Sequence, residues 1–170
     1  MTGDYPSVEA LLEAALAAFL PAGLRVVRRS GWWRSAAWPD PAAPAYLNAV
    51  AMVETPLSPR ALLAQLLAIE AKFGRRRTEP NAPRTLDLDL IAYGRQVMAE
   101  SGLVVPHPRA HERLFVMGPL AEIAQEWVHP VLGKTAAELA ASATVGVDAR
   151  PLAEVVALSP ARRPPTAPGR

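Results

Sequence analysis

The run from Pro83 to Ile91, Pro-Arg-Thr-Leu-Asp-Leu-Asp-Leu-Ile, constrains the fold of this 170-residue chain more than any other stretch. Leucine and aspartate alternate along it, which is the period of an extended strand whose successive side chains point to opposite faces. The leucines therefore predict a face packed on a core, and Asp87 and Asp89 share the other face. Two carboxylates roughly 6–7 Å apart at their Cα atoms can converge on a pair of divalent ions. We predict a strand over residues 84–93 with magnesium at the two aspartates, because carboxylate oxygens are hard ligands.

An Asp-x-Asp pair taken alone is also typical of the wet face of an edge strand. Here, however, Arg84 precedes Asp87 by three residues, and Arg75-Arg76-Arg77 lies a short distance upstream. Clustered guanidinium groups favour an anionic substrate beside the metal, although the same arginines could belong to a solvated loop. The cluster is too local for a nucleic-acid stripe and is better suited to one polyphosphate.

Composition predicts one compact domain over residues 1–156, followed by a disordered tail over residues 157–170 that is rich in proline and arginine. The chain has 51% hydrophobic residues and no cysteine, so disulfides and cysteine zinc sites are excluded. Without the three tail arginines, 15 basic residues stand against 16 acidic ones. The apolar stretch from Val8 to Leu20 contains Glu9 and Glu13, which argues against a signal peptide. We therefore expect a cytoplasmic protein.

Hydrophobic periodicity and capping residues predict the remaining elements. Ser7 and Ser58 are expected to cap helices that end near Gly23 and Gly74. A turn at Gly94 should be followed by a short return hairpin through residues 97–98. The predicted helices cover residues 8–19, 59–73, 111–123 and 135–142, and the predicted strands cover residues 24–34 with a break at Gly31, 46–55 and 84–93.

These motifs resemble the 6-hydroxymethyl-7,8-dihydropterin pyrophosphokinase family. The resemblance rests on the run from Pro83 to Ile91, on Gly74-Arg75-Arg76-Arg77 and on Val105-Pro106-His107-Pro108, and it extends over about residues 7–139. It implies an α+β fold, a ferredoxin-like α/β sandwich in which helices pack on an antiparallel sheet. It also implies a diphosphokinase that transfers diphosphate from ATP to the pterin hydroxymethyl group and releases AMP.

The resemblance also assigns roles to individual residues. Arg75 and Arg84 would act in catalysis together with Asp87 and Asp89, which would hold two Mg²⁺ ions. ATP would be bound by Glu70, Arg75, Arg77, Arg84, His107 and Arg113. The pterin would be bound by Ser35, Tyr46, Asn48 and Phe115, with Phe115 stacking on the ring and Asn48 hydrogen-bonded to it. We expect a monomer that acts on these small molecules and binds neither nucleic acid nor membrane.

Among the departures of this chain from the family pattern, two concern the surroundings of the pterin site. Family members begin with a short hydrophobic strand that ends in a Gly-Ser-Asn-Leu type turn, whereas this chain opens with Met1-Thr2-Gly3-Asp4-Tyr5-Pro6 and enters a helix directly. We therefore predict that the first strand is missing here and hypothesise that translation starts upstream of Met1. The alternative is that the chain is complete, and is either a degraded relative or one that fills the gap with another segment. In addition, Trp33-Arg34-Ser35-Ala36 stands where the family has Tyr-Arg-Thr-Pro, which alters one wall of the pterin site.

The sequence also bears on other classes of function. The chain has neither a G-x-x-x-x-G-K-[ST] loop nor a G-x-G-x-x-G loop, which excludes a P-loop or Rossmann site. A two-metal phosphoesterase would use the same aspartates, and a ferredoxin-like domain could bind nucleotide or RNA without catalysis.

His107, His111 and Glu112 suggest zinc only superficially, because Pro108 separates the histidines and a third ligand is not apparent. We expect His129 to be structural.

Overall fold

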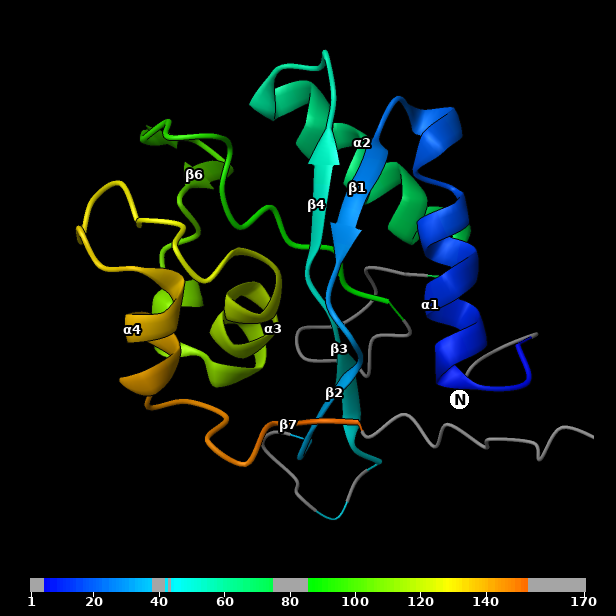
Figure 1. Ribbon diagram of the computed structural model, residues 1–170. Coiled ribbons are helices and arrows are strands. Elements are labelled where there is room, and N and C mark those ends of the chain that lie inside the picture. The colour runs from blue at the N-terminus through cyan, green and yellow to red at the C-terminus, as the bar shows by residue number, and fades with distance from the viewer. Residues whose placement is uncertain (1–4, 38–41, 43, 75–85, 153–170) are drawn as a thin grey trace, which may run out of the picture.

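The computed structural model describes residues 5–37, 42, 44–74 and 86–152. All its strand pairs are antiparallel, and helices pack on them, which confirms the predicted α+β class. Among the described residues, no helix is long and apolar enough to cross a bilayer. The elements are α1 (Val8–Ala17), η1 (Leu20–Ala22), β1 (Arg25–Arg29), β2 (Trp33–Ser35), β3 (Tyr46–Asn48), β4 (Ala51–Glu54), α2 (Pro59–Lys72), β5 (Met98–Glu100), β6 (Leu103–Val105), η2 (Ala110–Glu112), α3 (Leu114–Ala124), α4 (Ala136–Ala141) and β7 (Arg150–Pro151) (Figure 1).

A long antiparallel ribbon runs through the middle of the molecule (Figure 1). β1 pairs with β4 at one end, β2 pairs with β3 at the other, and β7 adds to the second edge of β2. The predicted strand over residues 46–55 is therefore two strands. The break has a local cause, because the Val50 N–H donates to Ser30 Oγ at 3.0 Å while the Ser30 N–H donates to the Val50 carbonyl at 2.9 Å. A side chain thus replaces one bond of the ladder at this point.

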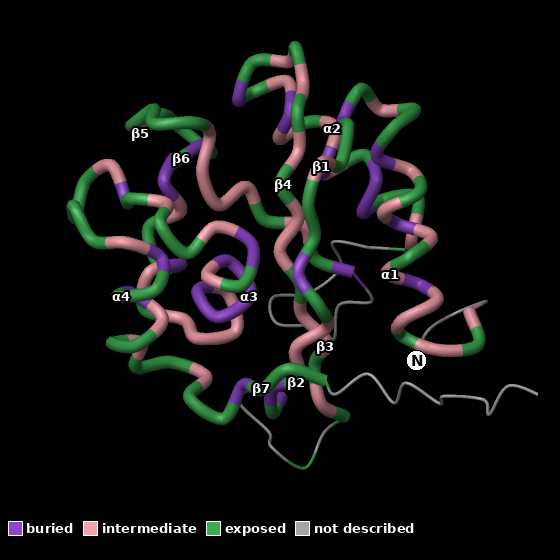
Figure 2. The backbone as a smooth tube through the Cα atoms, in the orientation of Figure 1, coloured by how far each residue is buried: buried purple, intermediate pink, exposed green. Residues whose placement is uncertain are grey.

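One core lies between α1, α2 and the β1–β4 end of the ribbon. Ser7 Oγ accepts from the Ala10 N–H at 3.2 Å, and Ser58 Oγ accepts from the Ala61 N–H at 3.3 Å, so both predicted caps are confirmed. The two helices and the segment between α1 and β1 contribute buried positions to this core (Figure 2). Their buried residues are Ala15, Phe19, Leu24, Leu62, Leu66 and Ile69, joined by Leu86.

A second core lies on the other side of the ribbon from α1, between α3, α4 and η2 (Figure 1). Its buried members are Ala110, Met117, Leu120, Ala136 and Leu139. α4 begins with a capping box in which Thr135 Oγ1 accepts from the Glu138 N–H and Glu138 Oε2 accepts from the Thr135 N–H. α3 also packs against β2 and β3, so this core supports the β2–β3 end of the ribbon.

The predicted aspartate strand is wrong as a paired strand. Over residues 86–93 the structure has no strand assignment, although burial alternates as predicted from Leu86 to Leu90. Within the described ranges, β4 pairs with β1 along one edge and no strand pairs with its other edge or with residues 86–93. Alternation identifies the buried face of a segment, but a ladder also needs a neighbouring strand.

The hairpin after the aspartates also differs from the prediction. The chain turns at Gly94, where the Gln96 N–H donates to the Tyr93 carbonyl at 3.0 Å. It does not return along the aspartate segment, because β5 pairs forward with β6 across a turn at residues 101–102. The tail at 157–170 lies outside the described residues. The expected strand upstream of Met1 falls outside this sequence and stays a prediction.

Candidate active site

The two aspartates lie on a segment that is fixed from three directions. The Leu86 side chain is 3% exposed and belongs to the first core, whereas Asp87 and Asp89 are exposed. The Leu88 N–H, between the two aspartates, donates to Glu70 Oε1 at 2.7 Å. Further along, the His107 N–H donates to the Ile91 carbonyl at 2.8 Å. These anchors hold the carboxylates toward solvent without a strand ladder.

Glu70 occupies the last turn of α2 and is 0% exposed. The sequence predicts this residue beside the nucleotide, with an exposed helix position as the alternative. In the structure the Glu70 side chain is buried and does not reach the surface. Glu70 instead accepts a hydrogen bond from the backbone N–H of Leu88, which lies between Asp87 and Asp89.

His107 lies half-buried beside the aspartate segment and near Arg113. Burial lowers the pKa of His107, the Arg113 and Arg109 charges lower it further, and the Asp89 carboxylate opposes them. His107 Nδ1 accepts from the Arg109 N–H at 3.2 Å. The neutral imidazole therefore carries its proton on Nε2, where it can donate to an anionic ligand.

Phe115 lies in the first turn of α3, close to Arg113. The Arg113 guanidinium carbon is 5.7 Å from the centre of the Phe115 ring. The ring also packs against Gly146, where an added Cβ would stand 2.3 Å from Phe115 Cδ1. Gly146 also has φ +65°, so two independent requirements favour glycine there. No local pattern predicts glycine at this position, because the ring that it contacts is 31 positions away in the sequence.

The predicted pterin residues Ser35, Tyr46 and Asn48 come together on the β2–β3 pair. Ser35 stands opposite Tyr46, and Trp33 stands opposite Asn48. Asn48 Nδ2 donates to Ser35 Oγ at 3.0 Å and to the Trp33 carbonyl at 3.4 Å. Because both contacts use the amide nitrogen, the amide is oriented with Oδ1 as the atom that can accept from a ligand.

Three predicted site residues, Arg75, Arg77 and Arg84, lie outside the described residues. Among the described residues, no group of three His, Cys, Asp or Glu side chains could hold a metal. His129 is 6% exposed, and its Nδ1 accepts from the N–H groups of Val131 and Leu132, as a structural histidine would.

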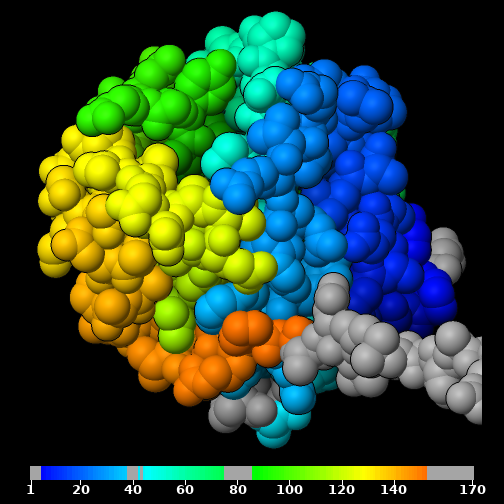
Figure 3. Space-filling view, in the orientation of Figure 1, coloured from blue at the N-terminus to red at the C-terminus, as the bar shows by residue number. Residues whose placement is uncertain are grey.

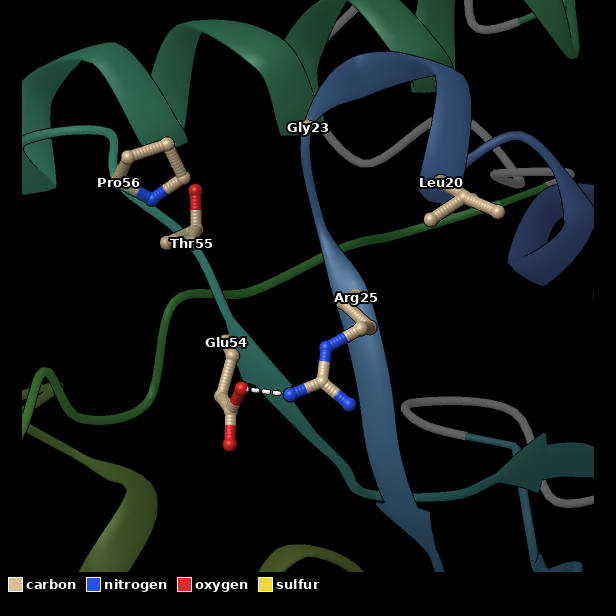
Figure 4. A pocket seen from close by; sticks show the side chains of 6 residues that line it. All are labelled: Leu20, Gly23, Arg25, Glu54, Thr55 and Pro56. Atoms are coloured by element: carbon tan, nitrogen blue, oxygen red, sulfur yellow. Dashed lines mark hydrogen bonds and ion pairs between the residues drawn. The ribbon is translucent and has the colours of Figure 1, made fainter.

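A surface pocket elsewhere does not coincide with this site. It lies where β1 begins and β4 ends, and it contains the ion pair between Arg25 and Glu54 (Figure 4). The lining residues are Leu20, Gly23, Arg25, Glu54, Thr55 and Pro56. None of them is a predicted site residue, so the candidate active site is defined by its side chains and not by this cavity.

Comparison with known proteins decides the family. The model of the 7,8-dihydro-6-hydroxymethylpterin-pyrophosphokinase family matches residues 4–125. The chain belongs to this family. The matched range contains the aspartate segment, His107, Arg113, Phe115 and the β2–β3 pair.

Three relatives carry the name 2-amino-4-hydroxy-6-hydroxymethyldihydropteridine pyrophosphokinase. The protein of Synechocystis is 50% identical over 129 residues, which is 75% of this chain and 66% of the relative. The protein of Haemophilus influenzae is 41% identical over 120 residues, covering 70% of this chain and 75% of the relative. The protein of Methylorubrum extorquens is 42% identical over 106 residues, covering 62% and 67%. The chain thus spans just under two thirds of the Synechocystis protein.

The pyrophosphokinase family match ends before α4, Gly146 and β7. These carboxyl-terminal parts nevertheless touch the site. The Leu114 N–H donates to the Val145 carbonyl at 2.8 Å, and the Ala36 N–H donates to Asp148 Oδ2 at 2.5 Å. The segment after α4 therefore packs against the start of α3 and the end of β2.

Proposed function

We propose that this chain transfers diphosphate from ATP to the hydroxymethyl group of 6-hydroxymethyl-7,8-dihydropterin and releases AMP. The pterin hydroxyl oxygen would attack the β-phosphorus, the bond from that phosphorus to the α–β bridging oxygen would break, and the hydroxyl proton would be lost. The observation that carries the proposal is the exposure of Asp87 and Asp89 next to the buried Leu86, with His107 close enough to Asp89 and to Arg113 for both charges to act on its imidazole. Family membership supplies the reaction class.

The residues present fit magnesium. Two exposed carboxylates without a third acidic partner among the described residues leave coordination positions for water and phosphate oxygens, as Mg²⁺ prefers. Asp87 and Asp89 would hold two such ions. When bound, the ions would neutralise phosphate charge and lower the pKa of the attacking hydroxyl group.

Cationic and neutral donors of this chain would orient the triphosphate. His107 presents its Nε2–H as a neutral donor, and Arg113 adds a permanent positive charge. Phosphoryl transfer depends mainly on such positioning and charge neutralisation. Arg75, Arg77 and Arg84 remain predicted contributors to the same task.

The pterin would lie between the β2–β3 pair and α3. Asn48 Oδ1 can accept from a ring N–H because its amide nitrogen is already engaged by Ser35 and Trp33. Phe115 supplies an aromatic face for stacking. Tyr46 is 49% exposed on the same strand as Asn48 and lies two residues before it, on the same face.

The test is an AMP assay with ATP, Mg²⁺ and the reduced hydroxymethylpterin. AMP should form only when the pterin alcohol is present, and chelation of Mg²⁺ should stop it. Release of AMP or phosphate from ATP alone would instead indicate a phosphoesterase. Absence of turnover combined with magnesium-independent RNA binding would favour a non-catalytic binding domain.

The same proposal includes a monomer that works in the cytoplasm on small molecules. The near balance of 15 basic and 16 acidic residues outside the tail supports the absence of a nucleic-acid partner. Sedimentation equilibrium at micromolar concentration tests the monomer, and a dimer that persists on dilution would contradict it.

A further inference from the structure

Glu122 is an exposed residue of α3 that links this helix to β2 and to the segment just before β2. Its Oε1 accepts from the Gly31 N–H at 2.7 Å, and its Oε2 accepts from Trp33 Nε1–H at 2.9 Å. The partners are 91 and 89 positions away in the sequence. Both oxygens of one carboxylate are thus committed to residues in and just before β2.

Trp33 makes a second contact with the same helix. Its ring lies so close to Gly118 that an added Cβ would be 2.6 Å from both Cζ3 and Cη2. Phe115, Gly118 and Glu122 are separated by three and four residues, so they share one face of α3. That face therefore carries the proposed stacking ring, the contact with the Trp33 ring and the acceptor for its N–H.

The backbone of Trp33 reaches the other half of the proposed pterin site. Trp33 stands opposite Asn48, and its carbonyl accepts from Asn48 Nδ2 at 3.4 Å. We infer that Trp33 and Glu122 are positioning residues that fix the separation between the Phe115 ring and the Asn48 amide, and so set the affinity for the pterin. The inference rests on the proposed function and adds to it two residues that act through Phe115 and Asn48.

Stability alone does not explain this arrangement. Glu122 is exposed, and hydrogen bonds in water-accessible positions contribute little net free energy of folding. A flat ring held by stacking on one side and an amide on another is sensitive to small displacements between the two supports. A link between β2 and α3 therefore matters more for ligand geometry than for unfolding.

The experiment compares Glu122→Gln and Trp33→Phe with Glu126→Gln. Glutamine at 122 turns an N–H₂ group toward one of two N–H donors, and phenylalanine at 33 keeps an aromatic ring but removes the donor. Glu126, four residues further along, has no described contact with β2 and is the matched charge-removal control. The Kd of the pterin is measured by calorimetry, and KM and kcat are measured by AMP release.

Both test variants should raise the Kd and KM for the pterin roughly three- to tenfold, the scale of one hydrogen bond, while the KM for ATP and kcat stay within about twofold. Glu126→Gln should match the wild type. The double variant Glu122→Gln with Trp33→Phe should be less than additive, because both changes remove the same bond.

Unchanged pterin affinity in both variants would overturn the inference. A proportional fall in kcat with unchanged KM values would indicate only a loss of folded protein and would also overturn it. Failure of the wild-type chain to bind the pterin or to form AMP would refute the proposed function instead, so the two failures are distinguishable.

Discussion

Replacement of Glu70 by methionine tests how the segment that carries Asp87 and Asp89 is held. The Glu70 side chain is fully buried, and its Oε1 accepts from the Leu88 N–H at 2.7 Å. Methionine has a similar length and fills the space, but it offers no comparable acceptor. Glu70→Gln keeps a side-chain oxygen at the same place. The pair of variants therefore separates loss of the hydrogen bond from loss of packing.

The expected size follows from the geometry. A backbone donor left without its partner away from bulk water costs about 1–3 kcal/mol. For a chain of this length, each kcal/mol corresponds to roughly 2–4 °C, so Glu70→Met should melt about 2–12 °C lower. Displacement of Leu88 would also misplace both carboxylates, and misplacement by about 1 Å can reduce the rate roughly 100-fold. Glu70→Gln should retain most of the stability and activity.

Thermal denaturation and a magnesium titration of AMP release provide the measurements. Glu70→Met should require more Mg²⁺ for half-maximal rate, while the Kd of the pterin stays near that of the wild type. Gln65→Met on the same helix is the control for adding methionine to α2, and it should change neither quantity. Wild-type melting and magnesium dependence in Glu70→Met would refute the proposed role of this hydrogen bond.

Three further predictions follow from single sites. Asp87→Asn or Asp89→Asn should lower kcat about 100-fold or more without lowering the melting temperature, because an exposed carboxylate side chain adds no packing. Turnover at the wild-type rate with magnesium still required would contradict this prediction. Gly146→Ala should destabilise the fold by more than Gly133→Ala, because both positions have positive φ but only position 146 would also clash with an aromatic ring. The left-handed backbone alone costs about 1–2 kcal/mol at either position. Equal denaturant midpoints for the two variants would disprove the clash. Burial, and then the nearby His111 imidazole, lower the pKa of His129, so the fold favours its neutral form and loses stability as pH falls below about 6.5. His129→Asn, which keeps an acceptor, should make that loss shallower by at most about 1.4 kcal/mol per pH unit, and an unchanged pH profile of unfolding would count against it.

Features set by neighbouring residues could be predicted from the sequence. The capping serines at 7 and 58 and the capping threonine at 135 act on N–H groups only three residues away, so local pattern is sufficient. Alternation likewise predicted that Leu86 is buried and that Asp87 and Asp89 are exposed. The proximity of Ser35 to Asn48 followed from the family resemblance and agrees with the strand register.

Features set by distant partners could not be predicted in this way. Glu70 and Glu122 are both glutamates on helices, yet one is fully buried and the other accepts bonds from two residues about 90 positions away. The break between β3 and β4 depends on the hydroxyl group of Ser30 across the ribbon. The need for Gly146 depends on the Phe115 ring. No periodicity in the chain carries such information.

The aspartate segment lies where the two cores meet, so the proposed function makes its placement matter for both proposed substrates. Leu86, Leu88 and Leu90 pack against the core of α1 and α2, whereas Ile91 packs against the core of α3 and α4. The first core lies against α2, which carries the buried Glu70 in its last turn. The second core holds the helix that carries Phe115. Metal-held phosphates and a stacked pterin would therefore be positioned by different cores that share one backbone segment. Changes at Glu70 should then alter magnesium dependence without altering pterin affinity, and changes at Glu122 should do the reverse. If either change altered both quantities equally, the two cores would have to move as one unit, and the division between a metal-positioning core and a pterin-positioning core would fail.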